Sequence, residues 1–121
     1  MPGGEFSAQE FWDTTLKKWL VSLIVLMNLR KGSTHPYALL KAFKKSRHPI
    51  FSNMDKSQVY NVLNALEKDG FVKSKAVLVG ARMQRIYSIT PRGNAVARSF
   101  MRIFSKFAKD VCTLIKSEFN E

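Results

Sequence analysis

Met54–Gly70, with the sequence MDKSQVYNVLNALEKDG, is the segment around which the other elements of this chain are organised. Asp55 can cap a helix here, because its carboxylate can accept a hydrogen bond from a backbone N–H of the first turn. Gly70 can end the helix in the left-handed conformation. The apolar residues between them recur at i, i+3, i+4 and i+7, on one helix face: Val59, Val62, Leu63 and Leu66. The pattern predicts an amphipathic helix.

The opposite face of this helix is polar and has no acid before the last turn, where Glu67 and Asp69 stand. Asparagine and glutamine can make bidentate contacts to adenine in the major groove, and serine and lysine can reach phosphate or guanine. We therefore interpret the segment as a recognition helix, the alternative being a merely solvated face. The predicted DNA contacts on it are Lys56, Ser57, Gln58, Tyr60, Asn61 and Asn64.

Charge supports a polyanionic partner. The chain has 121 residues and a formal net charge of +11, and its 45% hydrophobic content is that of a globular protein. No acid stands between Phe71 and Lys109, whereas basic residues recur throughout: Lys73, Lys75, Arg82, Arg85, Arg92, Arg98, Arg102, Lys106 and Lys109. This one-sided run favours nucleic acid over the alternative of a highly soluble surface.

Cysteine content and hydropathy indicate the compartment. Cys112 is the only cysteine, so no disulfide can form within the chain, which fits a reducing cytoplasm. The N-terminus lacks a basic region followed by a signal-peptide core. The apolar run Trp19–Leu29 is too short to span a bilayer. We expect a cytoplasmic, nucleoid-associated protein.

Two helices are predicted before Met54. Residues 1–6 are expected to be a disordered arm or an expression remnant, and a helix then continues to Lys31, either unbroken or interrupted near Asp13–Thr15. The second helix has Thr34 or His35 as its cap and Pro36 at its first position. Its expected buried residues are Tyr37, Leu40 and Phe43. The loop 46–53, which contains Pro49, is expected to hold no helix.

After Gly70 the apolar pattern changes to a period of two. Phe71–Val77 and Arg85–Thr90 are predicted strands of a hairpin, joined by a loop over Leu78–Gln84 with a basic tip. Arginine there can bind phosphate or enter a narrow minor groove. The lysines can add backbone contacts or simply protect a strand edge from aggregation. The hairpin residues predicted to contact DNA are Lys73, Lys75, Arg82, Gln84 and Arg85.

The last predicted helix opens at Thr90-Pro91 and can run to about Phe119, roughly 40 Å at 1.5 Å per residue. Its apolar residues form a heptad-like seam that one short domain cannot cover, so a C2 homodimer is expected. The alternative is that the helix folds back on its own domain. The predicted dimer interface takes residues from the first and last helices: Trp12, Leu16, Trp19, Phe100, Ile103, Phe104, Phe107, Val111 and Leu114.

The order helix, helix, helix, hairpin, long helix is that of a winged helix-turn-helix, in which the third helix enters the major groove and the hairpin wing touches the flanking backbone. The predicted fold class is therefore mainly α with a small β-hairpin. We divide the chain into a DNA-binding domain over residues 7–90 and a dimerisation helix over residues 91–121.

Three motifs in this order resemble those of PadR-family transcriptional regulators. THPYALL at Thr34–Leu40 resembles that family's histidine-glycine-tyrosine signature, YNVLNALEKDGFV at Tyr60–Val72 its recognition helix, and RMQRIYSITPRG at Arg82–Gly93 its second wing strand. Pro36 departs from the family, which usually has glycine there, and Ala81-Arg82-Met83 replaces its usual glycine-arginine-proline turn. Small archaeal winged-helix regulators have a similar layout and remain an alternative.

The resemblance implies a homodimeric, sequence-specific DNA-binding repressor, and some members respond to small, often aromatic ligands near the dimer interface. Two other functions stay open: an architectural or plasmid-partition protein that coats DNA, and a protein-interaction module. The sequence has no zinc-ligand spacing, phosphate-binding glycine loop or nucleophile–base arrangement. We therefore expect no enzyme activity and no cofactor.

Overall fold

The computed structural model describes residues 7–46 and 49–119, so the arm expected at residues 1–6 lies outside the described residues. Its elements are α1 (Ala8–Lys31), α2 (Pro36–Lys44), α3 (Pro49–Ser52), α4 (Lys56–Lys68), β1 (Val72–Val79), β2 (Arg82–Ile89) and α5 (Pro91–Phe119). The predicted fold class, mainly α with one antiparallel hairpin, is confirmed. The first helix is continuous, without a break near residues 13–15.

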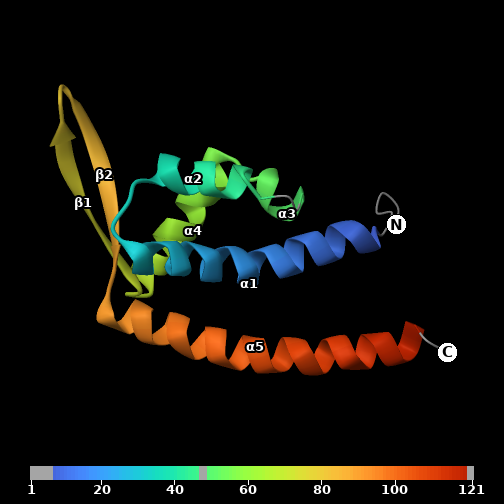
Figure 1. Ribbon diagram of the computed structural model, residues 1–121. Helices are drawn as coiled ribbons and strands as arrows, with labels where there is room; N and C mark the ends of the chain where they lie inside the picture. Colours follow the sequence, from blue (N-terminus) through green and yellow to red (C-terminus); the bar gives the residue numbers. More distant parts are fainter. Residues whose placement is uncertain (1–6, 47–48, 120–121) are drawn as a thin grey trace.

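Helix α1 separates two layers of the molecule. Helices α2, α3 and α4 lie on one side of it, and α5 runs along the other (Figure 1). The hairpin stands at one end, while the N-terminal end of α1 and the C-terminal end of α5 point toward the opposite end.

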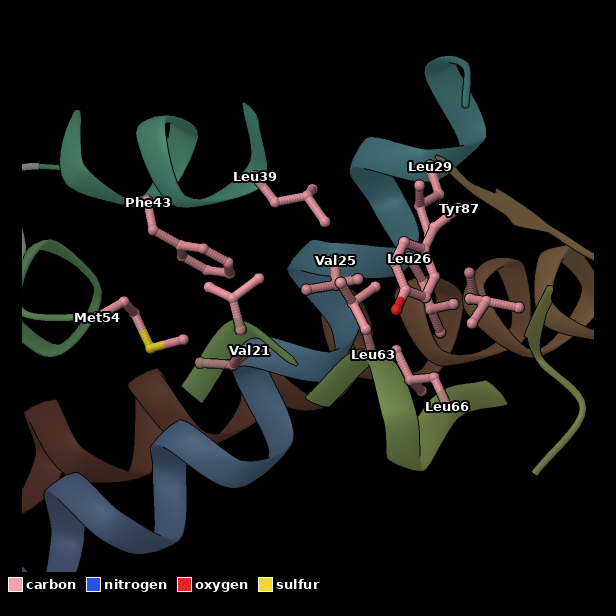
Figure 2. Packing of buried hydrophobic residues seen from close by; sticks show 13 residues of the cluster. Val21, Val25, Leu26, Leu29, Leu39, Phe43, Met54, Leu63, Leu66 and Tyr87 are labelled. Atoms are coloured by element: carbon pink, nitrogen blue, oxygen red, sulfur yellow. The ribbon is translucent and has the colours of Figure 1, made fainter. Parts of the chain in front are cut away.

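The hydrophobic core forms where α1, α2 and α4 meet the base of the hairpin. Figure 2 shows the side chains of these elements pointing toward one another. Val59, Leu63 and Leu66 of α4 are buried, and Val62 is partly buried at the edge of the core, as the helical period predicts. The other main contributors are Val21, Val25, Leu26 and Leu29 of α1, Leu39 and Phe43 of α2, and Tyr87 of β2.

Both ends of α4 form as predicted. The Gln58 backbone N–H donates to Asp55 Oδ1 at 2.9 Å, and the Asp55 N–H donates to Gln58 Oε1 at 2.9 Å, which makes a reciprocal capping box. Gly70 follows the helix with a φ of 81°, in the left-handed region that glycine adopts without strain.

His35, rather than Thr34, caps α2. Its Nδ1 accepts a hydrogen bond from the Ala38 N–H at 3.2 Å, and Pro36 follows at the first helical position. Thr34 instead exchanges two backbone hydrogen bonds with Tyr87, at 3.0 and 2.8 Å. The loop between α1 and α2 is thereby joined to the hairpin.

Two predictions before α4 are wrong. Tyr37 is exposed and Leu39 is buried in its place, because the face of α2 that meets the core carries Leu39 and Phe43 four residues apart. The loop 46–53 contains the single-turn helix α3. Pro49, which we expected to prevent a helix, stands at its first position, where a proline needs no N–H partner.

The hairpin is longer and its turn tighter than predicted. The strands pair from Val72↔Ile89 to Val79↔Arg82, so the loop expected at Leu78–Gln84 is wrong. Only Gly80 and Ala81 connect the strands. Gly80 has a φ of 63°, which the first position of a type II′ turn requires, and this turn matches the twist of paired strands.

Helix α5 begins directly at the base of the hairpin. The Gly93 N–H donates to the Thr90 hydroxyl at 3.0 Å, so Thr90 caps the helix as predicted. A Cβ on Gly93 would lie 1.9 Å from the backbone oxygen of Phe71, so only glycine allows this approach. Ala97 is buried in the core, but no residue after it is buried in the described part of α5. The domain division at residues 90 and 91 stays a prediction.

Candidate nucleic-acid interface

The polar face of α4 is presented to solvent, away from the core. Lys56, Ser57, Asn61 and Asn64 are exposed. Gln58 and Tyr60 are half-buried at the two margins of this face. Because Val59, Leu63 and Leu66 fix the rotation of the helix, Asn61 and Asn64 are held on the outward side.

Three residues of this face are engaged within the chain. Gln58 Oε1 accepts the Asp55 N–H of the capping box, so the Gln58 amide is held toward Asp55 and is less free to pair with adenine. Lys56 Nζ lies 5.9 Å from the centroid of the Tyr60 ring, within cation–π range. Of the six predicted DNA contacts on this helix, Asn61 and Asn64 are therefore the asparagines left exposed and without such an engagement in the described chain.

The hairpin register divides its predicted contacts between two faces. Side chains alternate across a strand, so Arg82 and Gln84 share a face with Lys73 and Lys75, whereas Arg85 lies on the other face. That other face carries Val72 and Tyr87 at its base and packs onto the core. Arg82 and Arg85 consequently do not form one cluster.

A hydrogen-bonded brace joins α4 to the wing. The Ser74 hydroxyl donates to Glu67 Oε2 at 2.8 Å, and Arg85 Nη1 donates to the Ser74 oxygen at 2.9 Å. Glu67 therefore serves to position the wing beside α4. The sequence did not indicate this role, because the three residues come from three different elements.

Tyr87 lies next to this brace. Burial raises the pKa of its phenol above the ordinary value of about 10, and the negative charge of Glu67 raises it further, while Arg85 opposes the shift. The hydroxyl thus stays protonated at the base of the wing.

Sequence reasoning missed basic residues from two other helices. Lys17 and Lys18 of α1 line a groove of about 350 Å³ together with Gln58 and Asn61, on the side of α4 opposite the wing brace. On α2, Lys41 Nζ lies 5.8 Å from the ring centroid of the exposed Tyr37. Neither set was among the predicted DNA contacts, which all came from α4 and the hairpin.

The basic run between Phe71 and Lys109 does not form one surface. Its hairpin residues stand beside α4, but α5 runs along the far side of α1 (Figure 1). Arg92 packs over the Phe71 ring, with its guanidinium carbon 5.2 Å from the centroid. The basic residues that lie near α4 are thus those of the wing and Lys17 and Lys18 of α1.

The predicted dimer residues that the structure describes are largely uncovered. Phe107 and Leu114 are 60% and 67% exposed, Ile103, Phe104 and Trp19 are also exposed, and Phe100 and Val111 are half-buried. The side chains of Trp12 and Leu16 lie outside the described residues. An apolar groove of about 350 Å³ between α1, α4 and α5 is lined by Trp19, Leu23, Phe71 and Phe100, among others.

Within residues 7–46 and 49–119, no three His, Cys, Asp or Glu side chains gather where they could hold a metal ion. No helix in those same ranges is long and apolar enough to cross a membrane.

The profile of the transcriptional regulator PadR-like family matches residues 25–99, more than half of the chain. The chain belongs to the PadR-like family. A PadR-like chain is a transcriptional regulator rather than an enzyme, as expected from the absence of catalytic motifs. No curated protein matches this PadR-like chain.

Solved PadR-like structures share its fold. A PadR family regulator from Eggerthella lenta is 22% identical with a TM-score of 0.72, covering 84% of this chain and 87% of that one. A PadR-like regulator from Bacillus cereus is 16% identical with a TM-score of 0.73, covering 84% and 96%. Bacillus subtilis PadR, solved in complex with operator DNA, is 24% identical with a TM-score of 0.61, covering 69% and 47%.

Proposed function

We propose that this PadR-like regulator binds double-stranded DNA sequence-specifically as a homodimer and represses transcription. The observation that carries the proposal is the outward polar face of α4, braced by the Glu67–Ser74–Arg85 hydrogen bonds to a basic wing. The likeness in fold to Bacillus subtilis PadR, which was solved with operator DNA, supports it further.

Recognition combines base reading with phosphate contacts. In the proposal α4 enters the major groove, where Asn61 and Asn64 make bidentate contacts to adenine and Ser57 and Lys56 reach phosphate or guanine. Lys73, Lys75 and Arg82, on the outer face of the wing, contact flanking phosphates. Lys17 and Lys18 add contacts on the opposite side of α4.

Dimerisation would set the spacing of the two recognition helices. Phe107 and Leu114 belong to an apolar seam on α5 that no element of the described chain covers, and a second copy of α5 would cover it. A C2 dimer would place two α4 helices in successive major grooves, roughly 34 Å apart. The expected site is therefore palindromic, with half-sites about one turn apart.

Such a dimer would cover a promoter that overlaps its site, which is the basis for proposing repression. The protein would then be located in the cytoplasm, associated with the nucleoid. The groove beside Trp19 and Phe100 is apolar and large enough for a small aromatic effector, as the family resemblance implies. Titration with simple aromatic acids while monitoring tryptophan fluorescence would test this part.

The deciding experiment is selection of bound duplexes from a random pool. We expect a palindromic consensus, and Asn61→Ala with Asn64→Ala should reduce discrimination against the wrong base by roughly 1–3 kcal/mol per lost contact. Ser99→Ala, an exposed position on α5, is the matched control and should leave the consensus unchanged.

Uniform coverage of DNA without a preferred sequence would instead favour the architectural or partition function, and the asparagine variants would then behave like wild type. Failure to bind any duplex at low salt would favour a protein-interaction module. For the proposed regulator, the logarithm of affinity should fall with the logarithm of salt by about 0.9 per phosphate neutralised.

A further inference from the structure

The tip of the wing carries exposed apolar side chains beside the expected Arg82. Leu78 and Met83 lie directly opposite each other in the hairpin register, one residue pair before the turn. Each is 66% exposed, although both are large apolar side chains. A solvent-facing tip needs no such residues for folding, and the pair contributes nothing to the core at the other end of the hairpin.

This tip pair faces the same way as the residues that contact α4. Alternation along the strands places Leu78 and Met83 on the face that also carries Ser74 and Arg85. Ser74 is bonded to Glu67 of α4, so this face is turned toward the recognition helix. In Figure 1 the hairpin extends well beyond its base, and its tip is free of the other elements.

The surroundings of the tip are cationic. Arg82 pairs with Val79 at the turn, Arg85 lies two residue pairs behind the tip pair on the same face, and Lys75 lies on the outer face. No acid stands between Phe71 and Lys109 in the sequence. An apolar pair surrounded by basic residues is complementary to nucleic acid, whose charged backbone encloses apolar base and sugar surfaces.

We propose that Leu78 and Met83 form an apolar wedge that enters the minor groove beside each half-site and partly unstacks a base step. This inference rests on the proposed DNA-binding function and deepens it. Leucine and methionine are among the side chains that minor-groove proteins insert between base steps, while neighbouring arginines and lysines hold the phosphates. The wedge adds a preference for flexible pyrimidine–purine steps, such as TA, outside the bases that α4 reads.

The test uses the full chain and the duplex selected from the random pool, with 2-aminopurine placed at successive flanking positions. Wild type should raise the fluorescence at one flanking step, because unstacking relieves the quenching of the probe. The double variant Leu78→Ala/Met83→Ala should lose this increase and bind on the order of tenfold more weakly, with the consensus read by α4 unchanged. Val79→Ala, exposed at the same tip on the other face, is the matched control and should behave like wild type.

The outcomes separate this inference from the function on which it rests. If wild type binds the selected duplex and the double variant matches it in fluorescence and affinity, the proposed wedge is rejected. The proposed DNA-binding function is then unaffected. If the double variant changes the sedimentation of the protein but not its DNA binding, the tip contacts protein and the wedge is also wrong. If wild type binds no duplex, the proposed function fails and the wedge fails with it. Circular dichroism melts of the variants exclude misfolding as the cause.

Discussion

The winged-helix part and the outer half of α5 are both built from amphipathic segments, but only the first completes its core within the chain. Val25, Val59 and Leu63 are fully buried between α1, α2 and α4. On α5, Gly93 and Ala97 are the buried residues of the described part, and the seam from Ile103 to Leu114 stays largely exposed. Equal periodicity thus gives two different outcomes, because burial depends on whether a second apolar face is within reach.

The strongest test of the winged-helix part, whose core is complete within the chain, is Leu63→Ala. Leu63 is fully buried at the centre of the α4 stripe, so the variant should lose about 2–5 kcal/mol of unfolding free energy. Urea denaturation measures the loss, which should not depend on protein concentration if this core belongs to one chain. A loss below about 1 kcal/mol would show that α4 packs less tightly than described.

The exposed seam on the outer half of α5 is tested by Phe107→Ala. We expect the dissociation constant of the dimer to rise roughly 30-fold or more, because a C2 interface loses the residue twice. Sedimentation equilibrium measures the constant, with the exposed neighbour Lys106→Ala as control. A wild-type chain that is monomeric at micromolar concentration would contradict the proposed dimer.

Removing the cap of α4 should have an intermediate effect. Asp55→Ala removes the acceptor for the Gln58 N–H and should lower the unfolding free energy by about 1 kcal/mol. Asp110→Ala, an exposed acid on α5, removes the same charge without a cap and should be close to neutral. Equal losses in the two variants would mean that net charge, rather than the capping box, accounts for the change.

The smallest expected effect concerns pH. Because burial raises the pKa of Tyr87 in the folded chain, the unfolded chain releases this proton first as the pH rises above about 10. The contribution of Tyr87 to the free energy of unfolding is therefore fully present below that pH. It is lost as the pH rises through the pKa of the folded chain. Thermal melts should show that Tyr87→Phe weakens this decline, whereas Tyr37→Phe, at an exposed position, leaves it unchanged.

Local signals predicted much of this architecture. The caps at Asp55 and Thr90, the left-handed Gly70 and the helical period of α4 and α5 all depend on residues close in sequence, and the structure bears them out. The single-turn helix α3 and the tight Gly80-Ala81 turn were missed, because weak local preferences over four or fewer residues do not define such short elements.

The candidate site was less predictable than the fold. Periodicity gave the outward face of α4, but the commitment of Gln58 to the capping box and the separation of Arg82 from Arg85 depend on hydrogen bonds and strand register. The Glu67–Ser74–Arg85 brace joins three elements, and the nearness of Lys17 to Asn61 joins two. These arrangements are tertiary, and no spacing in the sequence encodes them.

The joint at Thr90 has a consequence for how such a regulator evolves. The Thr90 hydroxyl shares its one proton between the Gly70 oxygen at 2.7 Å and the Phe71 oxygen at 3.1 Å. Gly93 packs against Phe71 without room for a side chain. The end of α4, the base of the wing and the start of α5 are therefore joined at one point. In the proposed dimer, a substitution that alters the crossing angle of the two α5 helices should change the distance between half-sites. The bases read within each half-site should stay the same. Spacing and base choice are then independent traits, which mutation can alter one at a time.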